Sequence, residues 1–329
     1  MRLANATIAG YGVAIPEGRL TNQELEARVD TSDAWIVERT GIRERRIAGP
    51  EESTATLATT AAAAAIKSAG LTPTEIDLMI VATASPEQPL PHTGAFVGDR
   101  LGLRCGSFDL AAACAGFVYE LVVGASMLTT GCRNVLIVGA ETVSRLMDPA
   151  DRATTILFGD GAGAAVLVPA TGDEGILAWD LGCDGSAAHL LEITAGGSRL
   201  PASLETVHAR QHYMTMAGQE VFRRAVRAVV DSAKLTLDRA GMTAADIDWF
   251  VPHQANIRII EAASSRLGIP PERTVVNIER YGNTSSASIP LALFEAVDDG
   301  RVKPGDLVLL SGFGAGMTWA SAVLRWGDR

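Results

Sequence analysis

Three polar side chains interrupt segments of this 329-residue chain that otherwise have the composition of a packed core. They are Cys114 in DLAAACAGF, His253 in FVPHQAN and Asn283 in RYGNTSSAS. A thiol can attack an acyl group, while an imidazole and a carboxamide can donate hydrogen bonds to a carbonyl oxygen that gains negative charge. Taken together, these residue types predict an enzyme that transfers acyl groups. Taken singly, each residue also has a non-catalytic interpretation: Cys114 as a structural cysteine, His253 as a core histidine and Asn283 as a turn asparagine.

Cys114 follows an expected strand, SFDL, and opens an expected helix, CAGFVYELVVGASML. The N-terminus of a helix carries unpaired N–H groups and partial positive charge, which favour a thiolate over a thiol. We therefore expect the pKa of Cys114 to be lowered. Small residues surround it and leave room for an acyl chain and for a backbone N–H that can donate to an oxyanion: Ala111, Ala112, Ala113, Ala115 and Gly116.

An internal repeat indicates how these residues are brought together. SAGLTPTEIDLMIVATAS from Ser68 matches RAGMTAADIDWFVPHQAN from Arg239, and each copy reads as a helix closed by glycine, a turn and a buried strand. Further along, the turn that holds Cys114 in the first copy corresponds to the turn that holds Asn283 in the second. If the copies are related by a pseudo-dyad, the two turns meet.

The repeat predicts an α/β fold of two related halves. Residues 1–174 would carry the nucleophile, and residues 175–329 would carry the histidine and the asparagine. Short apolar strands that alternate with helices predict mostly parallel, buried sheets packed back to back around helices. We expect about five strands in each half, near Thr7, Leu78, Phe108, Leu136 and Val166, and near Leu177, Phe250, Val276, Val308 and Ala322.

Composition and charge exclude several classes of protein. The chain is 47% hydrophobic and carries a formal charge of −10, which argues against disorder and against general affinity for nucleic acid or anionic membranes. The longest apolar stretch, residues 115–128, contains Glu120 and is too short to span a bilayer. No signal peptide is visible, so we expect a cytoplasmic protein. The four cysteines lack metal-ligand spacing, and we expect no metal.

Two glycine-rich segments, residues 159–167 and 311–319, look superficially like phosphate-binding loops. Both lack the GxGxxG and GxxxxGK[ST] patterns and lead into apolar strands. We interpret them as sites of close backbone packing, and the second could place an oxyanion-binding N–H near Ala315.

The motifs DLAAACAGF, VPHQANIRII and YGNTSSAS resemble the active-site motifs of the β-ketoacyl-acyl-carrier-protein synthase III family. The segments TSDAWIVERTGIRERRI and FGDGAGAAVL are also similar to that family, and the resemblance covers essentially the whole chain. It implies a thiolase-like fold with five αβαβα layers, a homodimer, and no cofactor, since acyl-coenzyme A is a substrate.

The resemblance also implies a reaction that initiates fatty-acid synthesis. An acyl group would pass from acyl-coenzyme A to Cys114, and decarboxylation of malonyl-acyl-carrier-protein would supply the carbanion that attacks the resulting thioester. His253 and Asn283 would donate hydrogen bonds to the malonyl thioester. The N–H groups of Cys114 and Ala315 would bind the oxyanion.

Further positions are assigned by the same resemblance. Coenzyme A would contact Trp35, Arg39 and Arg152. The acidic carrier protein would dock on Arg223, Arg224, Arg258 and Arg266, and ordinary surface arginines are the alternative there. The acyl pocket would be lined by Val143, Phe158 and Phe313, with Leu90 closing the pocket of the partner subunit and admitting longer or branched acyl groups.

Other functions stay open from sequence alone. A related enzyme could prime a polyketide or quinolone pathway or acylate an alcohol or amine. A papain-type hydrolase also has cysteine, histidine and asparagine in this order, but its cysteine lies in a different local motif near the mature N-terminus. A non-catalytic partner subunit is a third possibility, which the intact Cys114, His253 and Asn283 disfavour.

Overall fold

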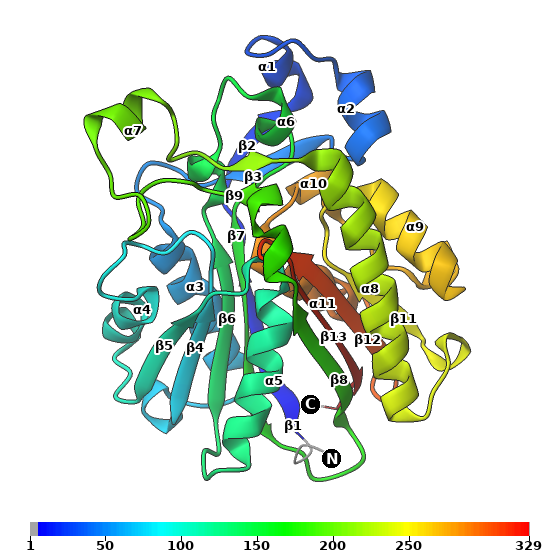
Figure 1. The fold of residues 1–329 in the computed structure, drawn as a ribbon. Coiled ribbons are helices and arrows are strands. Elements are labelled where there is room, and N and C mark those ends of the chain that lie inside the picture. The colour runs from blue at the N-terminus through cyan, green and yellow to red at the C-terminus, as the bar shows by residue number, and fades with distance from the viewer. Residues whose placement is uncertain (1–5, 329) are drawn as a thin grey trace.

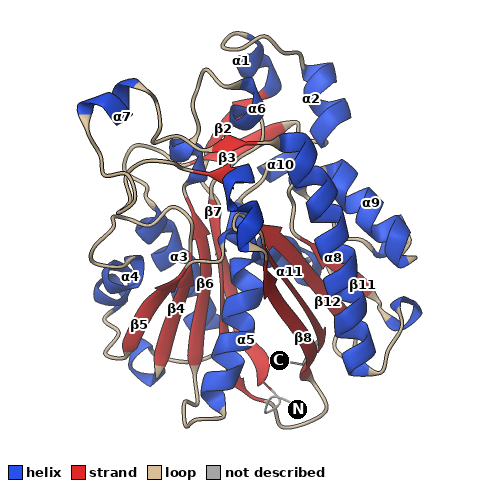
Figure 2. Ribbon diagram, viewed as in Figure 1, coloured by secondary structure: helices blue, strands red, loops and turns tan. Residues whose placement is uncertain are grey.

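Two β-sheets form the frame of the molecule (Figures 1 and 2). The computed structural model describes residues 6–328. The first sheet has the order β1-β7-β6-β4-β5, and the second has the order β11-β12-β13-β8. The strands of the first are β1 (Ala6–Ala14), β4 (Leu78–Ala82), β5 (Gly106–Leu110), β6 (Val135–Glu141) and β7 (Gly161–Pro169). Those of the second are β8 (Gly175–Cys183), β11 (Trp249–Pro252), β12 (Leu307–Gly314) and β13 (Thr318–Arg325).

Helices cover both sheets and fill the space between them (Figure 2). The outer face of the first sheet packs against α3 (Thr54–Ser68) and α4 (Thr93–Leu101). Between the sheets lie α5 (Gly116–Leu128) and α11 (Ser288–Asp298), and the outer face of the second sheet is covered by α8 (Gly218–Ala240) and α9 (Ile257–Leu267). The predicted thiolase-like arrangement of five αβαβα layers is therefore confirmed.

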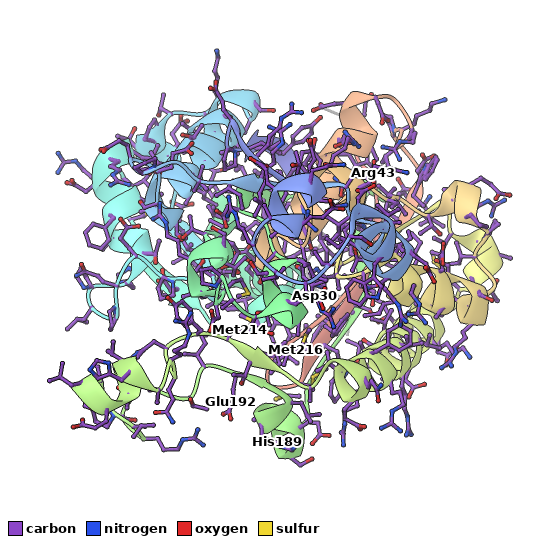
Figure 3. All side chains as sticks on the ribbon, turned by 90° about the horizontal axis from the view of Figure 1, so that it is seen from above. Asp30, Arg43, His189, Glu192, Met214 and Met216 are labelled. Carbon is purple, nitrogen blue, oxygen red and sulfur yellow. The ribbon has the colours of Figure 1, made fainter. Side chains whose placement is uncertain are left out.

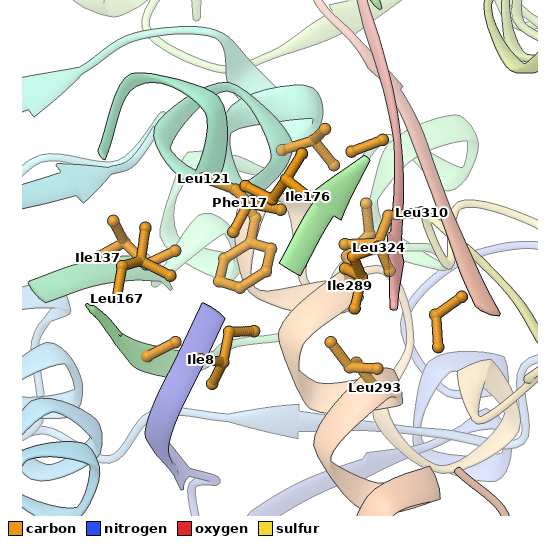
Figure 4. Packing of buried hydrophobic residues seen from close by; sticks show 14 of the residues in the cluster. Ile8, Phe117, Leu121, Ile137, Leu167, Ile176, Ile289, Leu293, Leu310 and Leu324 are labelled. Atoms are coloured by element: carbon orange, nitrogen blue, oxygen red, sulfur yellow. The ribbon is translucent and has the colours of Figure 1, made fainter. Parts of the chain in front are cut away.

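The layers are held by separate buried clusters of apolar side chains. The central cluster joins α5 and α11 to the inner faces of both sheets, and Figure 4 shows ten labelled members of it. Phe117 of α5 and Phe294 of α11 meet edge to face, with ring centroids 6.3 Å apart. Complete burial of such a side chain contributes roughly 1.5–3 kcal/mol, so the middle layer anchors the helix that Cys114 precedes.

The structure reproduces the internal repeat in detail. Gly241 caps α8 and Gly70 follows the cap residue of α3, and the two glycines have nearly equal positive φ angles, 70° and 69°. Each is followed by a 3₁₀ turn, η1 (Pro73–Glu75) and η5 (Ala244–Asp246), with the same capping box. The two copies therefore enter their buried strands, β4 and β11, through equivalent turns.

Two sequence predictions about the sheets are wrong. The sheets are mixed, because β7 returns antiparallel to β6 and β13 returns antiparallel to β12. The turn between β12 and β13, residues 315–317, is too short for the crossover that a parallel pair requires, whereas the longer segment between β6 and β7, residues 142–160, contains only short helical turns. The strand expected near Val276 is reduced to one bridge between Phe250 and Thr274, because the Gln254 side chain bonds the backbone of Val275 and Asn277 in place of a neighbouring strand.

Short elements cover the upper end of the layered body in Figure 1. Seen from above, Met214 and Met216 lie between the segment that carries Asp30 and the segment that carries His189 and Glu192 (Figure 3).

No helix among residues 6–328 has both the length and the apolar character needed to cross a membrane. The remaining strands are β2 (Gly18–Thr21), β3 (Glu44–Ile47), β9 (Leu191–Glu192) and β10 (Thr215–Met216). The remaining helices are α1 (Asn22–Glu26), α2 (Asp33–Thr40), α6 (Arg152–Thr155), α7 (Leu204–His208) and α10 (Ile278–Tyr281), with 3₁₀ turns η2 (Ala113–Ala115), η3 (Val143–Leu146), η4 (Gly185–Leu190), η6 (Pro271–Arg273) and η7 (Ser285–Ala287).

Candidate active site

Cys114 lies in the 3₁₀ turn η2, between the end of β5 and the start of α5. The backbone of β12 packs directly against this turn. A Cβ atom added to Gly314 would lie 2.5 Å from the Cys114 nitrogen, and one added to Gly312 would lie 3.3 Å from the Cys114 carbonyl oxygen. These two glycines are therefore needed for close approach, as the sequence predicted for this loop.

The Cys114 thiol is buried, and its protonation differs from the sequence prediction. Burial raises the pKa of the thiol to about 12, and the charge of Glu141 acts in the same direction. A hydrogen bond with Ser285 acts in the opposite direction but is outweighed. The expected lowered pKa is wrong because the sequence indicates a helix N-terminus but does not indicate how fully the sulfur is removed from water.

His253 follows β11 and is buried beside the aromatic ring of Phe313, whose centroid lies 5.6 Å from that of the imidazole. Burial lowers the pKa of His253 from 6.5 to about 3, so the ring is neutral near pH 7. Its Nδ1 lies 2.5 Å from the Ser288 hydroxyl oxygen, which also accepts the Gln254 N–H at 3.4 Å. In the tautomer in which the Ser288 hydroxyl donates to Nδ1, the hydrogen of the neutral ring is on Nε2, which can then donate it.

Asn283 follows α10 and is held by its backbone. Its N–H donates to the Leu157 carbonyl at 2.9 Å, and its own carbonyl accepts the Gly159 N–H at 3.0 Å. Its side-chain Oδ1 accepts the Ser285 N–H at 2.9 Å. Because the oxygen is engaged, the amide NH₂ is the end presented as a donor.

The three chemical groups meet around η7 and the end of β12. Turn η7 packs against the Cys114 turn η2, and the N–H of its Ser285 bonds the Asn283 amide, while β12 contacts Cys114 through Gly314 and His253 through Phe313. The site thus combines one nucleophile with two neutral hydrogen-bond donors. Such a set can accept an acyl group and stabilise an enolate.

Several polar residues that support the site were missed by sequence reasoning. Ser285 and Ser288 orient the amide and the imidazole. The buried Glu141, at the end of β6, accepts hydrogen bonds from the hydroxyls of Ser85 at 2.5 Å and Ser286 at 2.9 Å. A signal was present: TSSAS after Asn283 is a polar run at the start of a helix that is otherwise apolar.

Ala315 lies in the turn between β12 and β13, close to the Cys114 turn. The Thr318 hydroxyl donates to the Ala112 carbonyl at 2.9 Å and to the Ala315 carbonyl at 3.2 Å, which ties the two segments together. The two residues expected to bind the oxyanion are thus on adjoining turns.

A surface groove of about 800 Å³ lies beside this site. The Trp35 ring lies in its wall, with the guanidinium carbon of Arg152 4.9 Å and that of Arg39 5.8 Å from the ring centroid. The structure therefore brings together the three residues expected to bind coenzyme A. The groove also includes Leu157, whose carbonyl accepts the Asn283 N–H, and Asn256, three positions after His253.

The four arginines expected to receive a carrier protein fall into two sets. Arg223 and Arg258 lie on the wall of the groove. Arg223 and Arg224 both form ion pairs with Glu220, and Arg224 also pairs with Asp184 at 3.0 Å. Arg266 lies in the last turn of α9, at the opposite end of that helix from Arg258. Only the first pair is positioned beside the site.

The residues expected to shape the acyl pocket have different surroundings. Val143 and Phe158 are buried in one apolar cluster, and Phe158 forms a bridge with Asn283. Phe313 belongs to the cluster under α8 and stacks edge to face on His253. Leu90 is 83% exposed and therefore points away from the interior of its own chain. Among the described residues, no group of three or more histidine, cysteine or acidic side chains is arranged to hold a metal ion.

Comparison with known proteins supports the family resemblance over the whole chain. The family profile for 3-oxoacyl-acyl-carrier-protein synthase III matches residues 108–185, and the profile for its C-terminal part matches residues 237–326. A β-ketoacyl-acyl-carrier-protein synthase III from Symbiobacterium thermophilum is 51% identical over 329 residues, which cover 99% of this chain and 100% of that protein.

Solved structures are similarly close. That of the synthase III from Thermus thermophilus has a TM-score of 0.90 and 45% identity, covering 98% of this chain and 100% of the other. That of a priming β-ketosynthase from the R1128 polyketide pathway has the same TM-score at 37% identity, covering 100% and 99%.

Proposed function

The chain belongs to the β-ketoacyl-acyl-carrier-protein synthase III family, and from this we propose how its residues carry out the condensation. It is an acyltransferase of the condensing type, and its function is to initiate fatty-acid synthesis. The priming role in a polyketide pathway is not favoured, because the priming ketosynthase is 37% identical whereas the synthase III relative is 51% identical.

The first step is transfer of an acyl group from acyl-coenzyme A to Cys114. The sulfur attacks the thioester carbonyl, and the carbonyl oxygen becomes an oxyanion that the N–H groups of Cys114 and Ala315 bind. The bond to the coenzyme A sulfur then breaks, and the proton given up by the Cys114 thiol ends on the departing coenzyme A thiol. Loss of one such donor costs on the order of 3–4 kcal/mol in the barrier, and the tie through Thr318 supports this pairing.

The second step is decarboxylative condensation. Malonyl-acyl-carrier-protein loses CO₂, and the enolate that forms attacks the acyl-Cys114 carbonyl and releases the sulfur. His253 Nε2–H and the Asn283 amide donate hydrogen bonds to the enolate oxygen. The observation that carries the proposal is that Ser288 and Ser285 leave both groups as donors at neutral pH. This sequence of bonds requires neither a metal nor a redox cofactor.

We assign the groove to the two substrate carriers. The Trp35 ring and the Arg152 guanidinium form a stack that suits an adenine, and Arg39 would neutralise phosphate. The acidic carrier protein would be attracted to Arg223 and Arg258 on the groove wall. Arg224 and Arg266 would attract the carrier protein over a longer distance.

We further propose a cytoplasmic homodimer. β5 is the outermost strand of its sheet and carries Phe108, which is 38% exposed, so a second copy can continue the sheet. The exposed Leu90 would then close the acyl pocket of the partner, opposite Val143, Phe158 and Phe313. An aliphatic side chain there favours longer or branched acyl groups. A strict preference of the enzyme for acetyl-coenzyme A would reject this proposal about the pocket.

The function is tested by following the carrier protein. Malonyl-acyl-carrier-protein is incubated with the enzyme and with acetyl-, isobutyryl- or longer acyl-coenzyme A, and the mass of the carrier protein is measured. We expect 3-ketoacyl-acyl-carrier-protein with wild type and none with Cys114→Ala. Failure of wild type to form it from any acyl donor would refute the proposal.

A further inference from the structure

Arg45 of β3 is among the largest side chains that are completely buried in the molecule. Its guanidinium bonds two uncharged acceptors: Nε and Nη2 donate to the Ile156 carbonyl, and Nη1 donates to Asn22 Oδ1 at 2.6 Å. Burial lowers the pKa of Arg45 to about 10, so the group is still charged near pH 7. Taking a charge out of water without a charged hydrogen-bond partner is costly, so apolar packing alone does not explain an arginine here.

Arg45 lies behind residues 156–159, the segment that holds the backbone of Asn283. The carbonyl of Ile156 accepts the hydrogen bonds of the guanidinium. One residue later, the Leu157 carbonyl accepts the Asn283 N–H at 2.9 Å, and the Asn283 carbonyl accepts an N–H from the same segment at 3.0 Å. Ile156 and Leu157 also line the groove assigned to coenzyme A. This short segment thus contacts Arg45, Asn283 and the groove.

The aliphatic part of Arg45 approaches the amide donor from a second direction. A Cβ atom added to Gly282 would lie 2.9 Å from the Arg45 Cγ and 3.0 Å from the Leu157 carbonyl oxygen. Gly282 immediately precedes Asn283, so Arg45 limits where the backbone of the amide donor can lie. A change in the Arg45 side chain is therefore transmitted to Asn283 both through Gly282 and through residues 156–159.

Asn22 connects Arg45 to the helix that forms one wall of the groove. The Asn22 side chain is buried, and its Oδ1 accepts the Arg45 hydrogen bond while its Nδ2 donates to Asp33 Oδ1 at 2.7 Å and to the Ile42 carbonyl at 2.9 Å. Asp33 lies in the first turn of α2, and later residues of α2 line the groove. Because both ends of the amide are engaged, Asn22 fixes the start of α2 relative to Arg45.

We propose that Arg45 is a positioning residue for the condensation step and that, together with Asn22, it fixes the Asn283 amide relative to the wall of the coenzyme A groove. The proposal rests on the acyl-transfer function assigned above. Arg45 forms no bond to substrate and moves no proton; it acts through Gly282, through residues 156–159 and through α2. Displacement of a positioned group by about 1 Å can slow a reaction on the order of a hundredfold.

The two steps of the reaction distinguish this role from a purely structural one. In the proposed function, Asn283 donates to the enolate during condensation and takes no part in transfer of the acyl group to Cys114. A general loss of structure would impair both steps alike. A displaced Asn283 would instead slow condensation on enzyme that is already acylated.

The test uses Arg45→Met, which keeps an unbranched side chain and removes every donor. The enzyme is acetylated on Cys114, excess acetyl-coenzyme A is removed, and loss of the acetyl group after addition of malonyl-acyl-carrier-protein is followed by mass in a single turnover. We expect condensation to slow on the order of tenfold to a hundredfold, while acylation at saturating acetyl-coenzyme A stays within about twofold of wild type. Equal slowing of the two steps, or unchanged condensation, would overturn the proposal.

The matched control is Arg46→Met, at the next residue of the same strand. The Arg46 guanidinium donates to the Pro16 carbonyl and lies over the Tyr281 ring, and only the backbone carbonyl of Arg46 bonds Asp160. That backbone bond survives the substitution, so we expect condensation within about twofold of wild type. Slowing of condensation to the same extent in both arginine variants would remove the specific role of Arg45.

Asn22→Ala tests the connection to α2. It keeps Arg45 and its bonds to Ile156, and it removes the contact with Asp33. We expect the dissociation constant of coenzyme A, measured by calorimetry, to rise about fivefold, on the scale of one lost hydrogen bond, with a smaller effect on condensation than Arg45→Met has. The Arg45 variant should show the same weaker binding. Wild-type affinity in both variants would contradict the connection.

Arg45→Lys keeps the experiment decisive if Arg45→Met does not fold. A lysine retains the charge but presents a single nitrogen where the guanidinium presents a fork. We expect slower condensation with wild-type acylation, as for the methionine variant but to a smaller extent, and equal effects on the two steps would again overturn the proposal. Absence of acylation in wild type, with every donor tried, would instead show that the proposed function is wrong.

Discussion

At the scale of single residues, the chemistry depends on what surrounds three side chains as much as on their identity. The sequence was sufficient to single out Cys114, His253 and Asn283, because each is a polar residue at the end of an apolar strand or turn. It did not reveal that the thiol is buried deeply enough for its pKa to rise. Nor did it reveal Ser285 and Ser288, whose contacts appear only when separate elements fold together.

The buried imidazole makes a prediction for pH dependence. The pKa of His253 is lowered from 6.5 to about 3 by burial, so the ring stays neutral over about pH 5 to 8. We expect the condensation step, measured in single turnover from enzyme already acylated on Cys114, to show no inflection near pH 6.5. A fall in rate centred at that pH would show that the ring titrates normally and is not the buried donor described here.

The lowered pKa of His253 also affects the free energy of unfolding, and the direction of this effect can be measured. Below pH 6.5 the unfolded chain binds a proton at His253 that the native state does not bind, so the free energy of unfolding falls as pH decreases through 6.5 towards 3. Above pH 6.5 this contribution is constant. Urea unfolding of wild type and His253→Gln at several pH values should show a smaller loss at low pH for the variant, and equal losses would contradict the assignment.

At the scale of elements, the site is a product of the repeat. Equivalent helix ends and 3₁₀ turns place β4 and β11 in corresponding positions, and this much could be predicted from the matched segments. The antiparallel returns of β7 and β13 could not, because a buried antiparallel strand has the same apolar run as a parallel one. The lost strand at Val276 depends on the Gln254 side chain, which no local pattern indicates.

The contact between β12 and the Cys114 turn gives a second prediction. In Gly314→Ala the new Cβ would lie 2.5 Å from the Cys114 nitrogen, so the turn must shift. We expect a loss of about 1–3 kcal/mol in the free energy of unfolding, together with slower acylation. Gly185→Ala is the control, because a Cβ at that exposed glycine meets nothing within 4 Å. Wild-type acylation by Gly314→Ala would show that the contact is not needed.

At the scale of the whole molecule, the five layers bring one corner of each half to a common site. The sequence predicted this architecture through the repeat and the family resemblance. Charge also acts at this scale: on a chain with a net charge of −10, Arg223 and Arg258 beside the groove would provide the local basic region that the proposed acidic partner needs. The sequence could not predict that only Arg223 and Arg258, of the four arginines, lie beside the groove, because this depends on how α8 and α9 are placed at the surface.

The exposed edge of the first sheet predicts how two copies assemble. Phe108→Glu places a charge on β5, where a second copy would continue the sheet, and we expect it to yield monomers at concentrations where wild type is a dimer. Molar mass measured by light scattering distinguishes the two. Leu235→Glu, at a partly exposed leucine on α8, is the control and should remain dimeric. A dimeric Phe108→Glu variant would place the interface elsewhere.

The most direct test of the account is the mass of the intact enzyme after incubation with acetyl-coenzyme A. We predict a gain of one acetyl group per chain, located on the peptide that contains Cys114 and lost when malonyl-acyl-carrier-protein is added. Acetylation at another residue, or an acetyl group on Cys114 that malonyl-acyl-carrier-protein does not remove, would contradict it.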